Sequence, residues 1–377
     1  MNGDQMTMND YDDTLTRARA PGKIILSGEH AVVYGAPAIV CAITRYTTIG
    51  FAPIHRSRTI RTALAGISAG KHYHTAALHR LKDELDRRFE QYDRGERAVQ
   101  NILRRPDDLV IYSLATLLRH LPLPGFSAGS RLPVPGRLSS HSELPLGAGM
   151  GSSAAAIAAT LVLYEHLLGR PMSNQQRFER VRFCERLQHG KGSAIDATAT
   201  VYGGLHILRD GTPAPLAANL GSGWYWILSG IPIVSTGECV AHVRQQHGND
   251  TALWQCFANT TSALQEALAT GADPRPALRE NHRLLQHIGT VPAPAAALIA
   301  AIETAGGAAK ISGAGAHRGA GGGIILAYHP DPQAIPALLA AQPPLTWDAL
   351  HIAPRGAHIL PNDDTVTAPA PLAAVPS

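Results

Sequence analysis

The sequence has no apolar run long enough to cross a membrane, since its longest uncharged apolar stretch covers residues 154–164 and ends at Glu165. A membrane-spanning helix needs about 18 such residues or more. Residues 1–18 are acidic and lack an apolar segment, so we expect a loose tail rather than a secretory signal. The cysteines are too widely spaced for a disulfide framework or a zinc site, which favours a cytoplasmic protein: Cys41, Cys184, Cys239 and Cys256.

Charge is also scarce, because charged residues make up 16% of the chain and the formal net charge is only +4. Without clustered basic and aromatic residues, so small a surplus argues against a nucleic-acid partner. Lysine is rare, with 5 lysines beside 28 arginines. A lysine kept in such a chain is a candidate point charge for a phosphate or a carboxylate. Three of them lie beside glycine-containing stretches: Lys23, Lys191 and Lys310.

Apolar periodicity predicts a chain of mixed helices and strands, with no internal repeat. Strands are expected on either side of a polar loop within 23–43, near 137–142, over 224–234, and on both sides of a glycine-rich loop within 308–328. Helices are expected over 74–105, 107–120, 174–188, 250–270, 276–288 and 294–305, with a further helix starting near residue 193. Residues 361–377 are rich in alanine and proline and are expected to form a frayed tail.

Residues 145–153 carry three alternate glycines ahead of an alanine-rich helical stretch: Gly147, Gly149 and Gly151. Glycines let the backbone approach a ligand closely, and the N–H groups at a helix start attract phosphate. Ser152 or Ser153 can offer a hydroxyl to phosphate or Mg²⁺. The pattern is neither a Walker loop nor a dinucleotide fingerprint. A tight turn with a serine N-cap is the structural alternative.

Glu185 and Asp196 are separated by a turn whose glycines end the helix that carries Glu185. One interpretation makes Asp196 the base for an acceptor hydroxyl and Glu185 a ligand of Mg²⁺, because this cation prefers one or two carboxylates plus phosphate oxygens. Ser193 and Asp196 also match a capping box, so a structural helix start is the alternative.

Three further positions allow two interpretations each. Lys23 precedes a predicted strand, and taken without its context an exposed surface lysine is the favoured interpretation. His30 is equally ambiguous. The glycine-rich loop at 313–323 can bind phosphate or serve as a flexible hairpin connection.

Four segments together resemble the GHMP small-molecule kinases: APGKIILSGEHAVVYGAPAI, ELPLGAGMGSSAAA, HGKGSAIDATATVYGG and KISGAGAHRGAGGG. They occur in the family's order and span about residues 20–328. Within the family they look most like the mevalonate kinases, chiefly through GEHAVVYG and the spacing of Glu185 and Asp196. The resemblance implies ATP- and Mg²⁺-dependent phosphorylation of the primary hydroxyl of mevalonate to 5-phosphomevalonate, in isoprenoid precursor biosynthesis. Another acceptor (phosphomevalonate, the tertiary hydroxyl of mevalonate, homoserine or a sugar) and a nucleotide-binding regulator without turnover are the alternatives.

The resemblance also implies a role for each matching position. Asp196 would be the base, and Lys23 beside it would keep it ionised and stabilise charge on the acceptor oxygen. Ser153 and Glu185 would hold Mg²⁺. ATP would contact the glycine loops through Gly147, Gly149, Gly151, Ser152, Ser153, Gly313 and Gly315. The acceptor pocket would be lined by Glu29, His30 and Ser193.

The implied fold is α+β in two lobes, with nucleotide and acceptor between them. The N-terminal lobe (19–220) would be like domain 2 of ribosomal protein S5, with a left-handed βαβ feature, and the C-terminal lobe (221–360) ferredoxin-like. A homodimer is implied at family level, without a nucleic-acid or membrane partner. The sequence departs from the family where Ala316, His317 and Arg318 interrupt the third glycine run, and Arg318 is expected to add a cation over the triphosphate. A second departure, at Ser235 and His242, leaves the substrate contacts there open.

Overall fold

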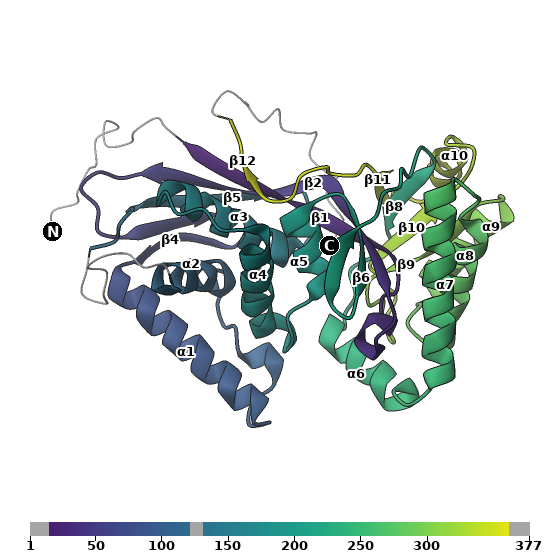
Figure 1. Ribbon diagram of the computed structural model, residues 1–377, viewed down its shortest axis with the longest axis horizontal. Helices are drawn as coiled ribbons and strands as arrows, with labels where there is room; N and C mark the ends of the chain where they lie inside the picture. Colours follow the sequence, from purple (N-terminus) through teal and green to yellow (C-terminus); the bar gives the residue numbers. More distant parts are fainter. Residues whose placement is uncertain (1–14, 121–130, 362–377) are drawn as a thin grey trace.

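The computed structural model describes residues 15–120 and 131–361, which form two sheets in two adjoining lobes (Figure 1). The first sheet has the order β12-β1-β2-β5-β3-β4, and β6 and β7 join it through β2. Its strands are β1 (Thr16–Ser27), β2 (Ala38–Pro53), β3 (Ile60–Leu64), β4 (Ser68–Tyr73), β5 (Gly136–Ser142), β6 (Leu205–Arg209), β7 (Thr212–Pro215) and β12 (His358–Ile359). The expected mixed α and β fold with two lobes is confirmed.

The long antiparallel pair of β1 and β2 lies within the first sheet and is its most extensive strand pairing. Lys23 on β1 lies opposite Ala42 on β2, and the register shifts on either side of it, between Pro21 and Gly22 and between Ile25 and Ser27. Such irregularities bend a strand and redirect its side chains. From Ala18 on, all but one residue of β1 is buried, because helices and the second lobe cover it. A polar side chain on this strand therefore faces protein rather than bulk water.

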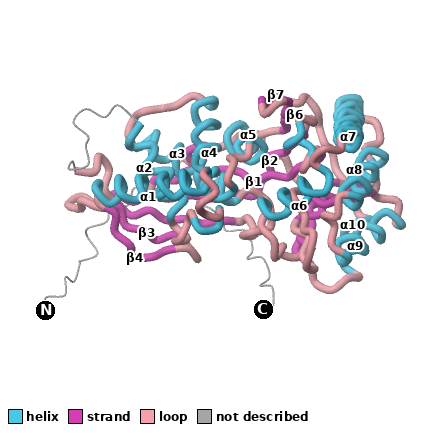
Figure 2. Tube along the Cα trace, turned by 90° about the horizontal axis from the view of Figure 1, so that it is seen from below, coloured by secondary structure: helices cyan, strands magenta, loops and turns pink. Residues whose placement is uncertain are grey.

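Five helices accompany the first sheet: α1 (Thr75–Asp93), α2 (Asp108–His120), α3 (Ser152–Leu167), α4 (Asn174–His189) and α5 (Ala194–Tyr202). Figure 2 shows α2, α3 and α4 on one side and β3 and β4 on the other. Helix α3 contacts β1, β2 and three neighbouring helices. Its alanine-rich first turns are almost fully buried, since small side chains let the helix approach the sheet closely. The helix is thereby fixed at the centre of this lobe.

The second sheet is antiparallel, with the order β11-β8-β10-β9. Its elements are β8 (Trp224–Leu228), α6 (Thr236–His247), α7 (Thr251–Thr270), α8 (Arg275–His287), α9 (Ala293–Thr304), β9 (Ala308–Ser312), β10 (Ile324–Tyr328), α10 (Ala334–Ala340) and β11 (Thr346–Ala349). Helices α7 to α10 gather on the outer side of this lobe (Figure 1). A separate apolar core holds it together, with Trp254, Phe257 and Ile299 among its buried members.

Several expected boundaries differ from the structure. The first helix ends at Asp93 rather than near residue 105, and the strand expected over 224–234 ends at Leu228. The hairpin β3–β4 and helix α6 were not expected. Strand β1 begins at Thr16, inside the segment expected to be an N-terminal tail, whereas residues 1–14 and 362–377 lie outside the described residues. No helix within 15–120 or 131–361 is long and apolar enough to cross a membrane.

The end of the described chain returns to the first lobe. Strand β12 pairs with β1, and Ile352 bridges to Ile43 on β2. Gly356 packs so closely on α5 that an added Cβ would lie 2.1 Å from the Val201 carbonyl oxygen. The segment from residue 352 to 359 therefore completes the first sheet, although the sequence places it in the second lobe.

Candidate active site

The glycine loop ahead of α3 has a backbone conformation that favours glycine. Gly147, Gly149 and Gly151 all have positive φ angles, of 75°, 85° and 75°. This left-handed region is costly for residues with a Cβ. Gly151 is itself the N-cap of α3, which corrects the alternative interpretation of a serine cap. Ser152 and Ser153 lie instead in the first turn, where backbone N–H groups have no partner within the helix.

This loop is attached to β1 beside Lys23. The backbone N–H of Lys23 donates to the Met150 carbonyl at 2.9 Å. A Cβ on Gly22 would lie 3.0 Å from the same carbonyl oxygen and 2.4 Å from the Leu144 side chain, so a larger residue would push against both. The first and second sequence segments are therefore in direct contact, although about 125 residues separate them in sequence.

Lys23 and Asp196 form an ion pair within this contact. The Lys23 Nζ lies 3.3 Å from Asp196 Oδ1, and the two side chains are only 7% and 17% exposed. Gly151 stands over the pair, since a Cβ there would lie 3.1 Å from Lys23 Cγ and 3.3 Å from Asp196 Oδ1. The interpretation of Lys23 as a surface residue is wrong. A cation, a carboxylate and the start of a helix meet at one point.

Ser193 explains why Asp196 faces this point. It is the N-cap of α5, and its Oγ accepts a hydrogen bond of 3.1 Å from the Asp196 N–H. The capping interpretation is thus correct for Ser193, but the Asp196 carboxylate is directed to Lys23. The backbone N–H of Asp196 takes part in the helix cap, whereas its carboxylate remains available for chemistry.

Glu185 lies beside the pair and is fully buried. Neither carboxyl oxygen has a hydrogen-bond partner within the described ranges. His189 Nε2 lies 3.6 Å from Glu185 Oε2, but burial lowers the pKa of His189 and favours its neutral form. Burial, and after it the Asp196 carboxylate, raise the pKa of Glu185 to about 8, although the nearby Ser153 hydroxyl and Lys23 ammonium oppose the rise. An orphaned buried carboxyl group is costly unless a ligand completes it.

The third glycine loop joins the same region. A Cβ on Gly323 would lie 3.2 Å from the Ala148 carbonyl oxygen, so the two glycine loops touch. Gly315 is held against the second lobe, where a Cβ would lie 2.1 Å from the Thr290 carbonyl oxygen. Gly313, with φ 110°, has open space where a Cβ would stand. Gly313 is thus the one of this pair that leaves room for a ligand.

Glu29 and His30 follow β1 and are buried, where they meet the second lobe. His30 Nε2 lies 2.9 Å from the Ala314 carbonyl oxygen. Burial lowers the pKa of His30, which favours a neutral ring that donates from this nitrogen. Glu29 forms an ion pair with Lys310 on β9. The structure therefore brings together Lys23, Glu29, His30, the glycine loops, Glu185, Ser193 and Asp196.

Lys310 is the site residue that the sequence did not assign. It is fully buried, and besides Glu29 its Nζ donates to the carbonyl oxygens of Ile311 at 2.8 Å and Ile25 at 3.3 Å. All three ammonium hydrogens are thereby used. Burial raises the pKa of Glu29 and lowers that of Lys310, and their pairing opposes both shifts. The scarcity of lysine marked Lys310 as a candidate point charge, but it did not indicate the partner.

The inserted residues of the third loop contact α6 instead of projecting freely. Arg318 Nη2 lies 2.8 Å from Glu238 Oε1, and the ring of His317 stacks on His242 with centroids 4.2 Å apart. Ser235 is the N-cap of α6. The Arg318 charge that we expected over a triphosphate is therefore paired with a carboxylate in this structure.

The chain resembles known kinases in sequence. The GHMP kinases N terminal domain matches residues 109–204. A mevalonate kinase of Pyrococcus horikoshii is 30% identical over 336 residues, which cover 84% of this chain and 89% of the relative. The chain belongs to the GHMP kinase family. It is therefore a kinase of a family that uses ATP, and the resemblance inferred from the four segments is confirmed.

Solved structures show the same fold. The mevalonate kinase of Methanococcus jannaschii aligns with a TM-score of 0.70 at 17% identity, covering 92% of this chain and all of that chain. A Lactococcus lactis galactokinase complexed with galactose aligns with a TM-score of 0.68 at 16% identity, covering 92% of this chain and 96% of that chain. Because kinases of different acceptors align equally well, the fold alone does not identify the acceptor.

Proposed function

We propose that this GHMP kinase transfers the γ-phosphoryl group of ATP to the primary hydroxyl of mevalonate. The observation that carries the proposal is the buried Lys23–Asp196 pair, 3.3 Å apart beneath the glycine loop. The choice of mevalonate is supported by the name of the relative that is 30% identical over most of both chains. The product is 5-phosphomevalonate.

The pair has the chemistry that transfer to an alcohol needs. As the acceptor oxygen bonds to the γ-phosphorus, its proton passes to the Asp196 carboxylate, and the bond to the bridging oxygen of ADP breaks. The Lys23 ammonium stabilises negative charge on the attacking oxygen. Because both side chains are largely removed from water, these interactions are stronger than they would be at the surface. The N–H groups of residues 151–153, at the start of α3, are placed to receive the phosphates.

The residues present fit a magnesium ion. Glu185 has two buried carboxyl oxygens without hydrogen-bond partners in the described part of the chain, and the Ser153 hydroxyl is near it. No group of three or more His, Cys, Asp or Glu side chains suited to a metal occurs within residues 15–120 and 131–361, so the remaining ligands would come from nucleotide phosphates and water. When bound with ATP, Mg²⁺ would neutralise charge on the transferring phosphates.

Binding of the magnesium nucleotide should release a proton from Glu185. With a pKa of about 8 this carboxyl group is mostly protonated at pH 7, whereas a metal ligand must be ionised. The preformed complex of Mg²⁺ with a non-hydrolysable ATP analogue should be titrated into the protein by calorimetry, in buffers of different ionisation enthalpy. We expect the release of nearly one proton per site at pH 7, and a smaller release above pH 8. Glu185→Gln should abolish it, and equal release by this variant would refute the assignment.

The same carboxyl group should make stability depend on pH. In the unfolded chain Glu185 ionises near its usual pKa of 4.5, whereas in the folded protein it keeps its proton to about pH 8. Between these values the folded state binds more protons, so its contribution to stability falls as the pH rises and then levels off. Glu185→Gln should therefore show a smaller decrease of the melting temperature between pH 5 and pH 8 than the unaltered protein.

An acceptor panel tests the proposed substrate directly. ATP consumption should be measured with mevalonate, phosphomevalonate, homoserine and galactose, and the position of the new phosphate determined by ³¹P and ¹³C NMR. We expect the highest kcat/KM with mevalonate and phosphate on the primary hydroxyl. A higher kcat/KM with another acceptor would show that mevalonate is not the preferred substrate, but it would not change the family assignment. Lack of acceptor-dependent ATP consumption would favour the non-catalytic regulator.

A further inference from the structure

A cavity lies between α1 and α4, and none of the candidate active-site residues lines it. It has a volume of about 310 Å³, which is within the range of small-ligand sites. Its walls come from the end of α1, one face of α4 and the turn that follows α4. The lining residues are Phe89, Glu179, Arg182, Phe183, Arg186, Gly190, Lys191 and Gly192.

The cavity gathers positive charge that the protein leaves partly unpaired. Arg182 Nε is buried without a hydrogen-bond partner among the described residues. Lys191 is exposed and has no ion pair there, whereas each of the other four lysines pairs with a carboxylate. The acidic lining residue, Glu179, is exposed and accepts a hydrogen bond from Gln175. An anion between Arg182 and Lys191 would satisfy both cations.

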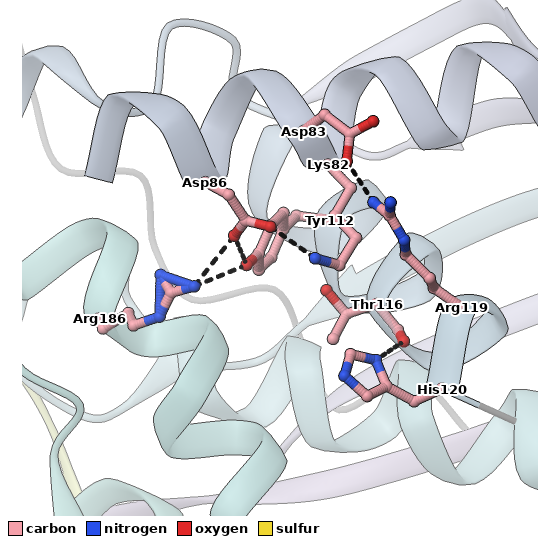
Figure 3. Close-up of polar contacts among 8 residues, drawn as sticks. All are labelled: Lys82, Asp83, Asp86, Tyr112, Thr116, Arg119, His120 and Arg186. Carbon is pink, nitrogen blue, oxygen red and sulfur yellow. Dashed lines mark hydrogen bonds and ion pairs between the residues drawn. The ribbon is translucent and has the colours of Figure 1, made fainter. Parts of the chain in front are cut away.

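Two phenylalanine rings, with the Arg186 guanidinium stacked on them, supply a rigid wall. The Arg186 guanidinium lies 3.8 Å from the ring centroid of Phe183 and 4.3 Å from that of Phe89. Figure 3 shows this guanidinium reaching from α4 to the Asp86 carboxylate of α1 and the Tyr112 hydroxyl of α2, with both contacts at 3.0 Å. Arg186 is thus held in place, and Phe183 remains 38% exposed for contact with a ligand.

The third wall of the cavity is the turn that links the two acids of the active site. Gly190 and Gly192 lie between Glu185 at the end of α4 and Asp196 on α5. A Cβ on Gly192 would lie 2.0 Å from the Arg182 carbonyl oxygen, and one on Gly190 would lie 2.1 Å from the Tyr92 hydroxyl. The turn therefore rests directly on α4 and α1, and a ligand joining Lys191 to Arg182 would fasten it there.

We propose that this cavity is a binding site for a small organic phosphate, separate from the active site. Its phosphate pairs with Arg182 and Lys191, and its apolar body packs on Phe89 and Phe183. The cavity is lined by the turn between Glu185 and Asp196 but by neither of those residues. The site is separate from the proposed phosphoryl transfer and does not depend on which acceptor the enzyme uses.

Phenyl phosphate is a suitable probe, with inorganic phosphate and phenol as its two halves. Its binding to the full-length protein should be measured by titration calorimetry with the active site saturated by a non-hydrolysable ATP analogue and Mg²⁺. We expect one site per chain, and a loss of affinity of about tenfold or more in Arg182→Met and in Lys191→Met, since each variant removes a charged hydrogen-bond donor to the phosphate. Arg244→Met, on the exposed face of α6, is the matched control and should bind normally.

Three results would overturn the proposal. The first is that phenyl phosphate does not bind once the active site is saturated. The second is that it binds both cavity variants as tightly as the unaltered protein. The third is that inorganic phosphate binds as tightly as the ester. Arg182 is half-buried, so its replacement can disturb folding, which circular dichroism and the melting temperature will show. Lys191 is exposed and unpaired within the described ranges, so Lys191→Met keeps the test decisive in that case.

Discussion

Asp196→Asn should lower turnover by about 10²- to 10⁴-fold, a rise of about 3–5 kcal/mol in the activation barrier. Asparagine keeps the shape of the side chain and its contact with Lys23 but cannot accept the proton of the acceptor hydroxyl. The Ser193 cap on α5 involves only the backbone of residue 196, so the helix should remain intact. The measurement is kcat with saturating Mg²⁺, ATP and mevalonate, together with the melting temperature.

The matched control for this variant is Asp210→Asn in the exposed turn between β6 and β7. Asp210 has a φ of 51°, a conformation that asparagine also tolerates, so this change should alter neither kcat nor stability. Activity of Asp196→Asn within a few-fold of the unaltered enzyme would remove Asp196 from the role of base. A large loss of activity accompanied by a large loss of stability would indicate a structural role instead.

Lys310→Met should destabilise the protein by about 3–5 kcal/mol, the usual cost of removing one partner from a buried ion pair. The change leaves the buried Glu29 carboxylate without its cation and two carbonyl oxygens, of Ile25 and Ile311, without their donor. Because β9 and the end of β1 belong to different lobes, the loss should loosen the contact between them. Urea unfolding followed by tryptophan fluorescence measures the effect.

A second replacement distinguishes pairing from packing. Adding Glu29→Gln to Lys310→Met removes the orphaned charge and should recover part of the lost stability. Lys191→Met is the control for removing a lysine and should change stability by about 0.5 kcal/mol or less, because that side chain is exposed. A double variant no more stable than Lys310→Met would show that the ion pair is not the source of the effect.

The sequence predicted the local parts of the site well. The alternate glycines at 147–151 permit a backbone conformation that other residues rarely adopt, and all three have positive φ angles. Most long helices were found because their apolar spacing is periodic, as in α4 and α7. Ser193 as an N-cap followed from a pattern of four adjacent residues. These features depend on neighbours in sequence, which a single chain reveals.

Long-range partners were not predictable in the same way. Lys310 was noticed as one of few lysines, but its partner Glu29 lies 281 residues away. The hairpin β3–β4 pairs with β5 across more than 60 residues, and its short strands alternate weakly. The cavity between α1 and α4 depends on how two helices pack. Spacing in one sequence does not specify such contacts, because they depend on the register and packing of distant elements.

The return of residues 352–359 to the first sheet bears on how the protein can be divided. A fragment cut at residue 220 would contain most of the first lobe but would leave the outer edge of β1 bare where β12 covers it. Unpaired strand edges favour association with other chains. In topological terms the second lobe is an insertion between the last two strands of the first, and neither half of the polypeptide is a self-sufficient folding unit.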